Sequence, residues 1–134
     1  MVSKLRAQRI ADRIHEILSE MIILEVKDPR LSGIFITGVE VDRELTFADI
    51  YVSALEGAQR AKEVIAGLEH ASGYLRTELT KRIELRTFPR LRFHWDKTPE
   101  HADKIERLIA SIQSDLTRKS NIGESEQTNE VGNQ

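Results

Sequence analysis

The sequence predicts an α+β fold in which helices back one face of a small mixed sheet. Apolar residues recur at three- and four-residue spacing in four segments, the pattern of amphipathic helices, and alternate with polar residues in three others, the pattern of strands. These segments follow one another in the order α-β-β-α-α-β-α, which favours a mixed sheet with helices on one face. With 134 residues, the chain has the size of one domain.

The first helix is expected over residues 5–26. Ser3 is suited to cap its first turn. Asp28-Pro29 is suited to end the helix, because proline disfavours helical geometry in the residue before it. The residues that form its apolar stripe are Leu5, Ile10, Ile14, Ile17, Leu18, Met21 and Ile22.

A β-hairpin is expected over residues 34–54. The alternation in residues 34–42 predicts that one face of the first strand carries Phe35, Thr37, Val39 and Val41. The second strand, residues 47–54, is expected to share one side among Ala48, Ile50 and Val52. Because the link Asp42-Arg43-Glu44 is short and polar, the two strands are expected to pair antiparallel.

The helical period returns over residues 58–71 and resumes over residues 74–83. Ser72-Gly73 lies between the two segments, so two helices separated by a kink are expected. A third strand follows, in which three apolar residues alternate with three basic or imidazole side chains. The apolar residues are Leu91, Phe93 and Trp95, and the others are Arg90, Arg92 and His94.

A last helix is expected to begin at Thr98-Pro99-Glu100, where threonine caps, proline suits the first turn and glutamate favours the helix dipole. Residues 120–134 are too polar to bury a core, so we expect a domain over residues 1–119 and a flexible acidic tail over residues 120–134. The apolar stripe of this helix is expected to join the core and consists of Ile105, Leu108, Ile109, Ile112 and Leu116.

Composition and missing motifs exclude several classes of protein. The chain has no cysteine, which excludes disulfides, thiol catalysis and cysteine-based zinc sites. No apolar run reaches the roughly 20 residues of a membrane span, and the first residues lack the apolar stretch of a signal peptide, so we expect a cytoplasmic protein without a membrane partner. Because phosphate-loop, nucleophile-elbow and zinc-protease motifs are missing, we expect no enzyme activity, cofactor, metal or small-molecule substrate.

Charge is unevenly distributed along a chain whose net charge is only −2. Residues 1–13 carry Lys4, Arg6, Arg9 and Arg13 against Asp12 alone. In residues 74–97 the acidic residues are Glu78, Glu84 and Asp96, and the basic ones are Arg76, Lys81, Arg82, Arg86, Arg90, Arg92 and Lys97. The protein is therefore expected to be electrostatically polarised, with two basic segments.

The geometry expected at Ala71-Ser72-Gly73 suits a phosphodiester backbone. A kink there would expose backbone N–H groups at the positive end of the following helix, and glycine would allow a phosphate to approach closely. Basic residues on a helix face are otherwise a common device for solubility, so charge alone leaves both interpretations open.

The chain resembles the bacterial ribosome-binding factor A family over roughly residues 4–116. The residues that carry the resemblance are Glu25-Val26-Lys27-Asp28-Pro29-Arg30-Leu31, the hairpin, and Ala71-Ser72-Gly73-Tyr74-Leu75-Arg76. The resemblance implies a single type II KH-like domain whose helix–kink–helix carries Ala-x-Gly. It also implies an assembly factor that binds immature 30S particles and 16S rRNA, acts in late 16S rRNA processing and supports growth in the cold.

This resemblance raises RNA binding to the leading hypothesis, with the small ribosomal subunit as the partner of a monomer. The expected RNA-binding residues are Lys4, Arg6, Arg9, Ser72, Gly73, Arg76, Lys81, Arg82, Arg86, Arg90 and Arg92. Two alternatives stay open, namely a protein-interaction module and a small-ligand regulatory α/β domain.

Several residues have a structural and a functional interpretation. Arg30 either contacts a phosphate or pairs with Asp28, and the structural interpretation is favoured. Phe47 and Tyr51 share one strand face, where they either stack on bases or, as we expect, pack against the last helix or one another. His94 is expected to face solvent. The carboxylates of Glu40, Asp42, Glu44 and Asp49 are expected to be solvated rather than bound to a divalent ion.

Overall fold

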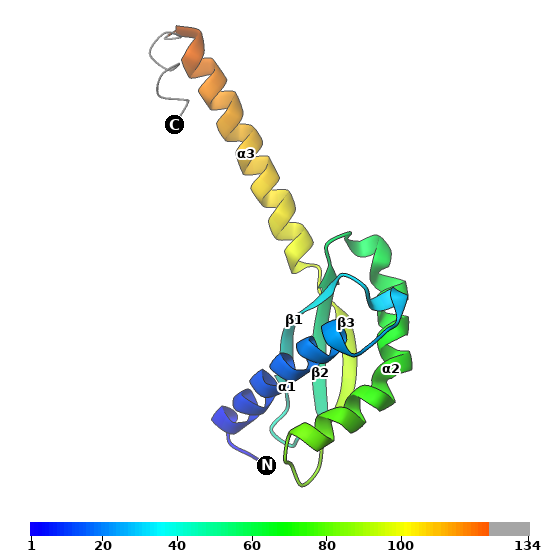
Figure 1. The fold of residues 1–134 in the computed structure, drawn as a ribbon. Coiled ribbons are helices and arrows are strands. Elements are labelled where there is room, and N and C mark those ends of the chain that lie inside the picture. The colour runs from blue at the N-terminus through cyan, green and yellow to red at the C-terminus, as the bar shows by residue number, and fades with distance from the viewer. Residues whose placement is uncertain (124–134) are drawn as a thin grey trace. The chain divides into compact units, whose positions relative to one another are not determined.

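The computed structural model describes the backbone of residues 1–123 and the side chains of residues 1–102 and 105–117. The chain divides into two compact units, Met1–Lys97 and Thr98–Gln134. The first unit contains α1 (Lys4–Leu24), β1 (Ile34–Val41), β2 (Phe47–Ala54), α2 (Ala61–Arg82) and β3 (Arg90–Trp95), and the second contains α3 (Thr98–Gly123) (Figure 1).

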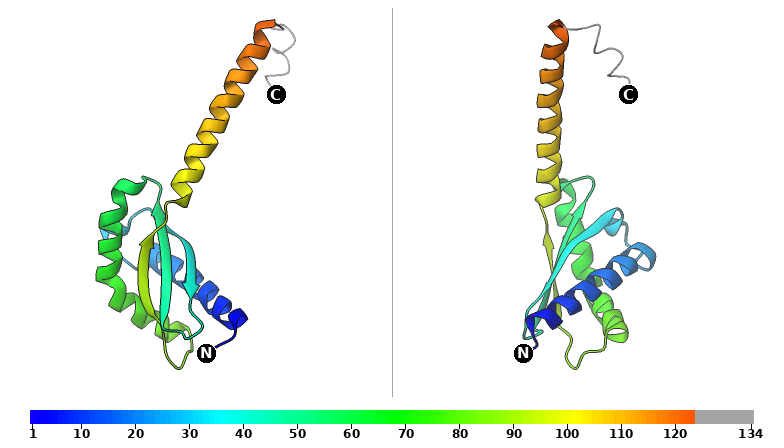
Figure 2. Two further views of the ribbon diagram at one scale, coloured as in Figure 1. Left: turned by 180° about the vertical axis from the view of Figure 1, so that it is seen from behind. Right: turned by 90° about the vertical axis from the view of Figure 1, so that its left-hand side faces the viewer.

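The first unit is a three-stranded mixed sheet with α1 and α2 on one of its faces. The strand order is β1-β2-β3, with β1 and β2 antiparallel and β2 and β3 parallel, so α2 is the crossover between the parallel pair. The left view in Figure 2 shows the face of the sheet that neither helix covers. The core lies between the sheet and the helices, where the fully buried side chains include Ile14, Leu18, Ile50, Val52, Val64, Leu68, Leu75 and Leu79. The predicted α+β architecture is confirmed.

The prediction for the faces of β1 is wrong, because the strand contains an irregularity. The pairing with β2 shifts register between Ile36 and Gly38, which is the effect of a β-bulge. Ile34 and Ile36 before the shift and Val39 after it are buried, whereas Phe35 is 38% exposed. A strict two-residue alternation would have placed Val39 on the face of Phe35, and one extra residue reverses that assignment.

The expected pair of helices is one continuous helix. The α-helix runs without interruption from Ala61 to Arg82, and Figure 1 shows that α2 bends along its length. Serine–glycine pairs commonly allow such bends, and Ser72-Gly73 lies near the middle of α2. Because the helix continues, the N–H groups that follow Gly73 belong to its own hydrogen-bond ladder. The expected site at an exposed helix N-terminus is therefore wrong.

The segment between α1 and β1 is held against α2. The helix α1, whose first turn Ser3 caps by accepting a hydrogen bond from the Arg6 N–H at 3.0 Å, ends at Leu24. Beyond that end, a short 3-10 turn, Pro29–Leu31, packs on α2 at Gly67. A Cβ at Gly67 would lie 3.0 Å from Leu31 Cδ2, so glycine permits this close approach.

The unit Thr98–Gln134 contains α3, which runs as far as Gly123, so residues 120–123 of the predicted tail are helical. Residues 124–134 lie outside the described residues. Within its own unit, α3 does not bury the apolar stripe, and Ile109 is 48% and Leu108 62% exposed. The expectation that these side chains join the core of the first unit stays a prediction.

Candidate nucleic-acid interface

An open groove of about 850 Å³ lies where the bend of α2 faces the hairpin turn and the start of β3. Its lining brings together three separate parts of the chain and five of the eleven residues expected to bind RNA, namely Ser72, Gly73, Arg76, Arg90 and Arg92. The other lining residues are Glu44, Leu45, Thr46, Phe47, Thr87, Phe88 and Leu91. We refer to this hollow as the groove.

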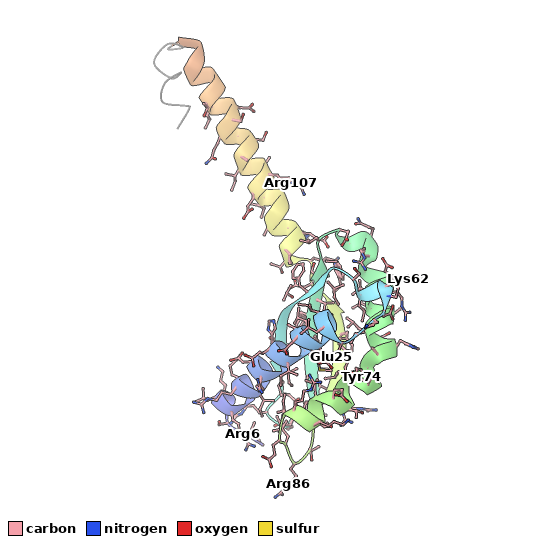
Figure 3. The ribbon with its side chains drawn as sticks, in the orientation of Figure 1. Arg6, Glu25, Lys62, Tyr74, Arg86 and Arg107 are labelled. Atoms are coloured by element: carbon pink, nitrogen blue, oxygen red, sulfur yellow. The ribbon has the colours of Figure 1, made fainter. Side chains whose placement is uncertain are left out.

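The N-terminal basic segment is tied to the turn that lines the groove. The Val2 N–H donates to the Arg43 carbonyl at 2.8 Å, and Arg43 Nε donates to the Val2 carbonyl at 3.0 Å. Figure 3 shows Arg6 and Arg86 at the same end of the first unit. The two basic segments, separated by some 70 residues in the sequence, therefore meet at the end of the unit that carries the groove.

Gly73 leaves open space at the groove, because a Cβ built on it would have no heavy atom within 4 Å apart from its own helix backbone and chain neighbours. Such a position allows the backbone of a ligand to approach closely. Ser72 and Gly73, which the sequence predicts as RNA contacts, thus both line the groove, although the groove does not contain a helix N-terminus.

Arg76 holds the loop that forms one wall of the groove. Its Nη2 donates to the Phe88 carbonyl at 2.8 Å and its Nε donates to the Pro89 carbonyl at 3.2 Å. Two of its donor groups are thus used within the protein, and the side chain is half-buried. This structural role was not expected from the sequence, because Phe88 and Pro89 are more than ten residues away.

Lys81 and Arg82 are paired with acidic residues. Lys81 Nζ lies 3.1 Å from Glu78 Oε2. Arg82 bridges Glu25, at the end of α1, at 2.9 Å and Glu78 at 3.2 Å. Hydrogen bonds from Lys81, and then the nearby charges of Lys81 and Arg82, keep the pKa of Glu78 below its ordinary value despite some desolvation. These two cations are partly neutralised in the free protein.

Five of the other expected cations are exposed and available. Among the residues that the structure describes, none makes a side-chain hydrogen bond or ion pair with Arg86 or Arg90. The same is true of Lys4, Arg6 and Arg9 on the first turns of α1. A phosphate could therefore contact these five side chains without breaking an existing pair.

Arg92 and His94 both contact one carboxylate on the open face of the sheet. Arg92 Nε and Nη2 donate to Asp49 at 2.8 and 3.0 Å, and His94 Nε2 lies 2.7 Å from Asp49 Oδ1. The hydrogen bonds from Arg92 lower the pKa of Asp49, partial burial opposes that effect, and His94 adds to it. His94 lies on the open face of the sheet, as expected, with its side chain 41% exposed, and the pairing with Asp49 was not expected from the sequence.

The aromatic residues of β2 pack on β3 rather than on one another. The Phe47 ring centroid lies 3.8 Å from Arg92 Cζ, a cation–π contact. Tyr51 stacks on His94 with ring centroids 5.1 Å apart, and its hydroxyl donates to Glu40 at 2.9 Å. The parallel register places Tyr51 opposite His94 and so explains the stack.

Asp28 and Arg30 form the structural pair that the sequence favoured. Arg30 Nη2 lies 2.7 Å from Asp28 Oδ2, and the Arg30 N–H donates to Asp28 Oδ1 at 2.9 Å. Sequence reasoning missed Arg60, which donates to the carbonyls of Arg30 and Ser32 and so fixes the same loop. Because Arg60 lies 30 residues beyond Arg30 in the chain, no local sequence pattern predicts this contact.

The acidic residues of the hairpin do not form a cluster around a shared centre. Asp42 accepts the N–H groups of Thr46 and Phe47 at 2.9 and 2.7 Å and so closes the turn. Glu40 accepts a hydrogen bond from Tyr51, and Asp49 is paired with Arg92 and His94. Within the described part of the chain, no group of three or more histidine or acidic side chains could hold a metal ion. None of the described helices has the length and hydropathy of a membrane span.

The chain is similar in sequence to a known family. A family model described as "Ribosome-binding factor A" matches residues 6–109. A ribosome-binding factor A of Thiobacillus denitrificans is 43% identical over 104 residues, which cover 78% of this chain and 84% of the relative.

Solved structures support the same similarity. The solution structure of a Thermotoga maritima protein assigned to this family matches with a TM-score of 0.61 and 30% identity, covering 70% of this chain and 90% of that one. A homology model of Thermus thermophilus ribosome binding factor A, fitted into a cryo-EM map of a complex with the 30S subunit, matches with a TM-score of 0.52 and 26% identity. That match covers 62% of this chain and 87% of the other. The fold is therefore that of these proteins and is consistent with a KH-like domain.

Proposed function

The chain belongs to the ribosome-binding factor A family, and we propose that it binds immature small ribosomal subunits by gripping 16S rRNA at the groove. The observation that carries this proposal is the meeting of two basic segments and an open hollow at one end of the first unit. Contacts of arginine and lysine with phosphates position a protein on RNA without reading its sequence.

The proposed action is differential binding. A factor that binds an immature arrangement of rRNA more tightly than the mature one increases the population of the arrangement it prefers. The protein would then leave when the mature arrangement forms or when another factor displaces it. Roles in late 16S rRNA processing and growth in the cold, a cytoplasmic location and a monomeric state belong to the same proposal.

The cations that would contact RNA differ in whether they are already paired with a carboxylate. Arg86 and Arg90 are exposed and unpaired among the described residues, so a phosphate contact costs them no existing interaction. Lys81 and Arg82 would have to share their charge with Glu78 and Glu25. We therefore place the main grip on Arg86 and Arg90, with Lys4, Arg6 and Arg9 as a second contact.

Binding of the full chain to purified immature small subunits and to 16S RNA fragments, measured over a salt series, tests the proposal. For single-stranded RNA, log affinity falls with log salt with a slope of about −0.7 for each neutralised phosphate. The double variant Arg86→Gln, Arg90→Gln should bind more weakly, with a slope shallower by about 1.4. The matched control Lys81→Gln, Arg82→Gln removes the same charge and should change the slope less.

Two results would contradict the proposal. Binding that is insensitive to salt would mean that phosphates are not the contact. If the slope of log affinity against log salt is the same for the wild type and the Arg86, Arg90 variant, with folding verified by circular dichroism, then RNA does not bind at the end of the unit that carries the groove.

A second candidate function, protein binding, is favoured by α3. Within its own unit, α3 leaves its apolar side chains Ile109 and Ile112 48% and 50% exposed. If α3 is the contact, Ile109→Ser and Ile112→Ser should abolish binding to small subunits, whereas the Arg86, Arg90 variant should retain it.

A further inference from the structure

Arg92 lines the groove with its charge already compensated. Its Nε and Nη2 donate to the two carboxylate oxygens of Asp49 at 2.8 and 3.0 Å, so the pair is bidentate. The Phe47 ring packs against the guanidinium, with its centroid 3.8 Å from Cζ. The guanidinium plane is therefore held in one orientation beside the groove, and a phosphate that enters meets an arginine already occupied.

Asp49 is itself held by a second group. His94 Nε2 lies 2.7 Å from Oδ1, and the parallel register sets Asp49 opposite Arg92 with His94 two residues further along β3. The carboxylate can therefore keep one hydrogen-bond partner if Arg92 leaves it. The side chain of Arg92 is 48% exposed and that of Asp49 is 20% exposed, so Arg92 is the member of the pair that solvent and ligands reach.

A carboxylate and a phosphate present the same acceptor geometry to a guanidinium. Both offer two oxygens that accept parallel N–H bonds from its fork. Asp49 occupies on Arg92 the donors that a phosphate would use. Arg90, which precedes Arg92 by two residues on β3 and also lines the groove, has no such competitor among the described residues.

We propose that Asp49 is an exchangeable internal counter-ion, which an RNA phosphate replaces on Arg92 while Asp49 remains on His94. This inference rests on the proposed RNA binding at the groove. In the free protein Asp49 positions the guanidinium, and the free energy of the Asp49–Arg92 ion pair opposes binding of a phosphate to Arg92. Arg92 then adds affinity only for a backbone whose phosphate can match the bidentate contact.

The exchange has a distinctive salt dependence. A phosphate that contacts a free cation releases a condensed counterion, which produces the slope of about −0.7 for each contact. When Arg92 exchanges partners, the negative charge of Asp49 that Arg92 had compensated is left beside the RNA, so the local net charge is unchanged and the net counterion release at this contact is close to zero. With asparagine at position 49 no negative charge is left behind, and the Arg92 contact makes its full contribution to the slope.

The test measures the affinity of the full chain for a fluorescently labelled single-stranded fragment of 16S rRNA over a salt series. Asp49→Asn should bind about two- to fivefold more tightly at low salt, the equivalent of removing an exposed ion pair. Its slope should be steeper by about 0.7. Glu44→Gln is the matched control, because Glu44 lines the groove, carries the same charge and is unpaired among the described residues.

Glu44→Gln should leave the slope unchanged, since it alters only the general electrostatic potential. Adding Arg92→Gln to Asp49→Asn should remove the gain, which shows that the gain acts through Arg92. The Arg92 Nε–H resonance of the wild type should shift on addition of the RNA. Urea unfolding of each variant verifies that the fold is retained.

The possible failures are distinguishable. Equal effects of Asp49→Asn and Glu44→Gln, with RNA binding intact, would overturn the exchange and leave the proposed function standing. Weaker binding by a folded Asp49→Asn variant would also overturn the exchange, since it would mean that RNA needs the intact pair. If neither the wild type nor Asp49→Asn binds RNA in a salt-dependent manner, the proposed function fails and the exchange fails with it.

Discussion

The guanidinium of Arg76 donates a 2.8 Å hydrogen bond to the carbonyl oxygen of Phe88 and so ties the middle of α2 to the loop before β3. A second bond, to the Pro89 carbonyl, makes the contact two-pronged. Both residues lie on or next to the wall of the groove. The shape of the groove thus depends on a side chain that the sequence predicted only as an RNA contact.

Replacing Arg76 should therefore reduce stability as well as RNA binding. Hydrogen bonds that involve a charged group contribute about 1.5–3 kcal/mol, so Arg76→Met should lower the free energy of unfolding by about that amount in urea titrations. Arg86→Gln is the control, because an exposed side chain without a partner should change stability by less than about 0.5 kcal/mol. Equal stability of the two variants would show that the Arg76 contacts are not formed in solution.

Two glycines of α2 should respond in opposite ways to alanine. Gly67→Ala should destabilise the protein by about 1–3 kcal/mol through overpacking, because the new Cβ would lie 3.0 Å from Leu31 and 3.2 Å from Arg30 Cβ. Gly73→Ala should stabilise it by up to about 1 kcal/mol, since alanine favours helix and the site is open. Thermal and urea unfolding measure both changes.

Gly73→Ala should nevertheless weaken RNA binding, because the methyl group occupies the space through which a backbone would approach the groove. The combination of higher stability and lower affinity is the expected result. Unchanged affinity in the stabilised variant would show that the RNA does not approach the protein at Gly73.

The stability of the protein should depend on the ionisation of Asp49 in acid. Its pKa in the folded state is lowered, chiefly by hydrogen bonds from Arg92, so the fold favours the ionised form. This contribution is present above the pKa of an unfolded aspartate, about 3.9, and is lost as pH falls through the lower folded value.

Urea unfolding between pH 7 and pH 3 should show that the stability difference between the wild type and Asp49→Asn narrows below about pH 4. The variant lacks the titrating carboxylate, so its stability should fall less over this range. A difference that stays constant down to pH 3 would contradict the assignment.

Ser53 is completely buried, and its hydroxyl has no hydrogen-bond partner among the described residues. A buried polar group without a partner costs about 1–3 kcal/mol, so Ser53→Ala should raise the free energy of unfolding by about 1 kcal/mol. Ser53→Thr keeps the hydroxyl and should show no such gain. A loss of stability in the alanine variant would mean that the hydroxyl is satisfied in solution.

Local patterns were sufficient for most of the secondary structure. Periodicity predicted β2 at its observed bounds, and α1 and β3 to within about two residues, because each of these elements has one clear apolar face. The predictions failed in two places. In β1 one extra residue shifts the strand register, and in α2 the helix continues through a serine–glycine pair. The register shift near Gly38 and the continuity of α2 through Ser72-Gly73 depend on pairing and packing that no local window contains.

In the candidate site, too, the sequence predicted some features and only the tertiary structure decided others. The sequence alone determined which residues are basic, that Ser72-Gly73 is a weak point of its helix, and the family resemblance that the comparisons confirmed. Only the tertiary structure decided which of those charges are available. Coulomb interactions and hydrogen bonds depend on distance in space, and the partners Asp49 of Arg92, Glu25 of Arg82 and Phe88 of Arg76 lie 43, 57 and 12 residues away in the chain.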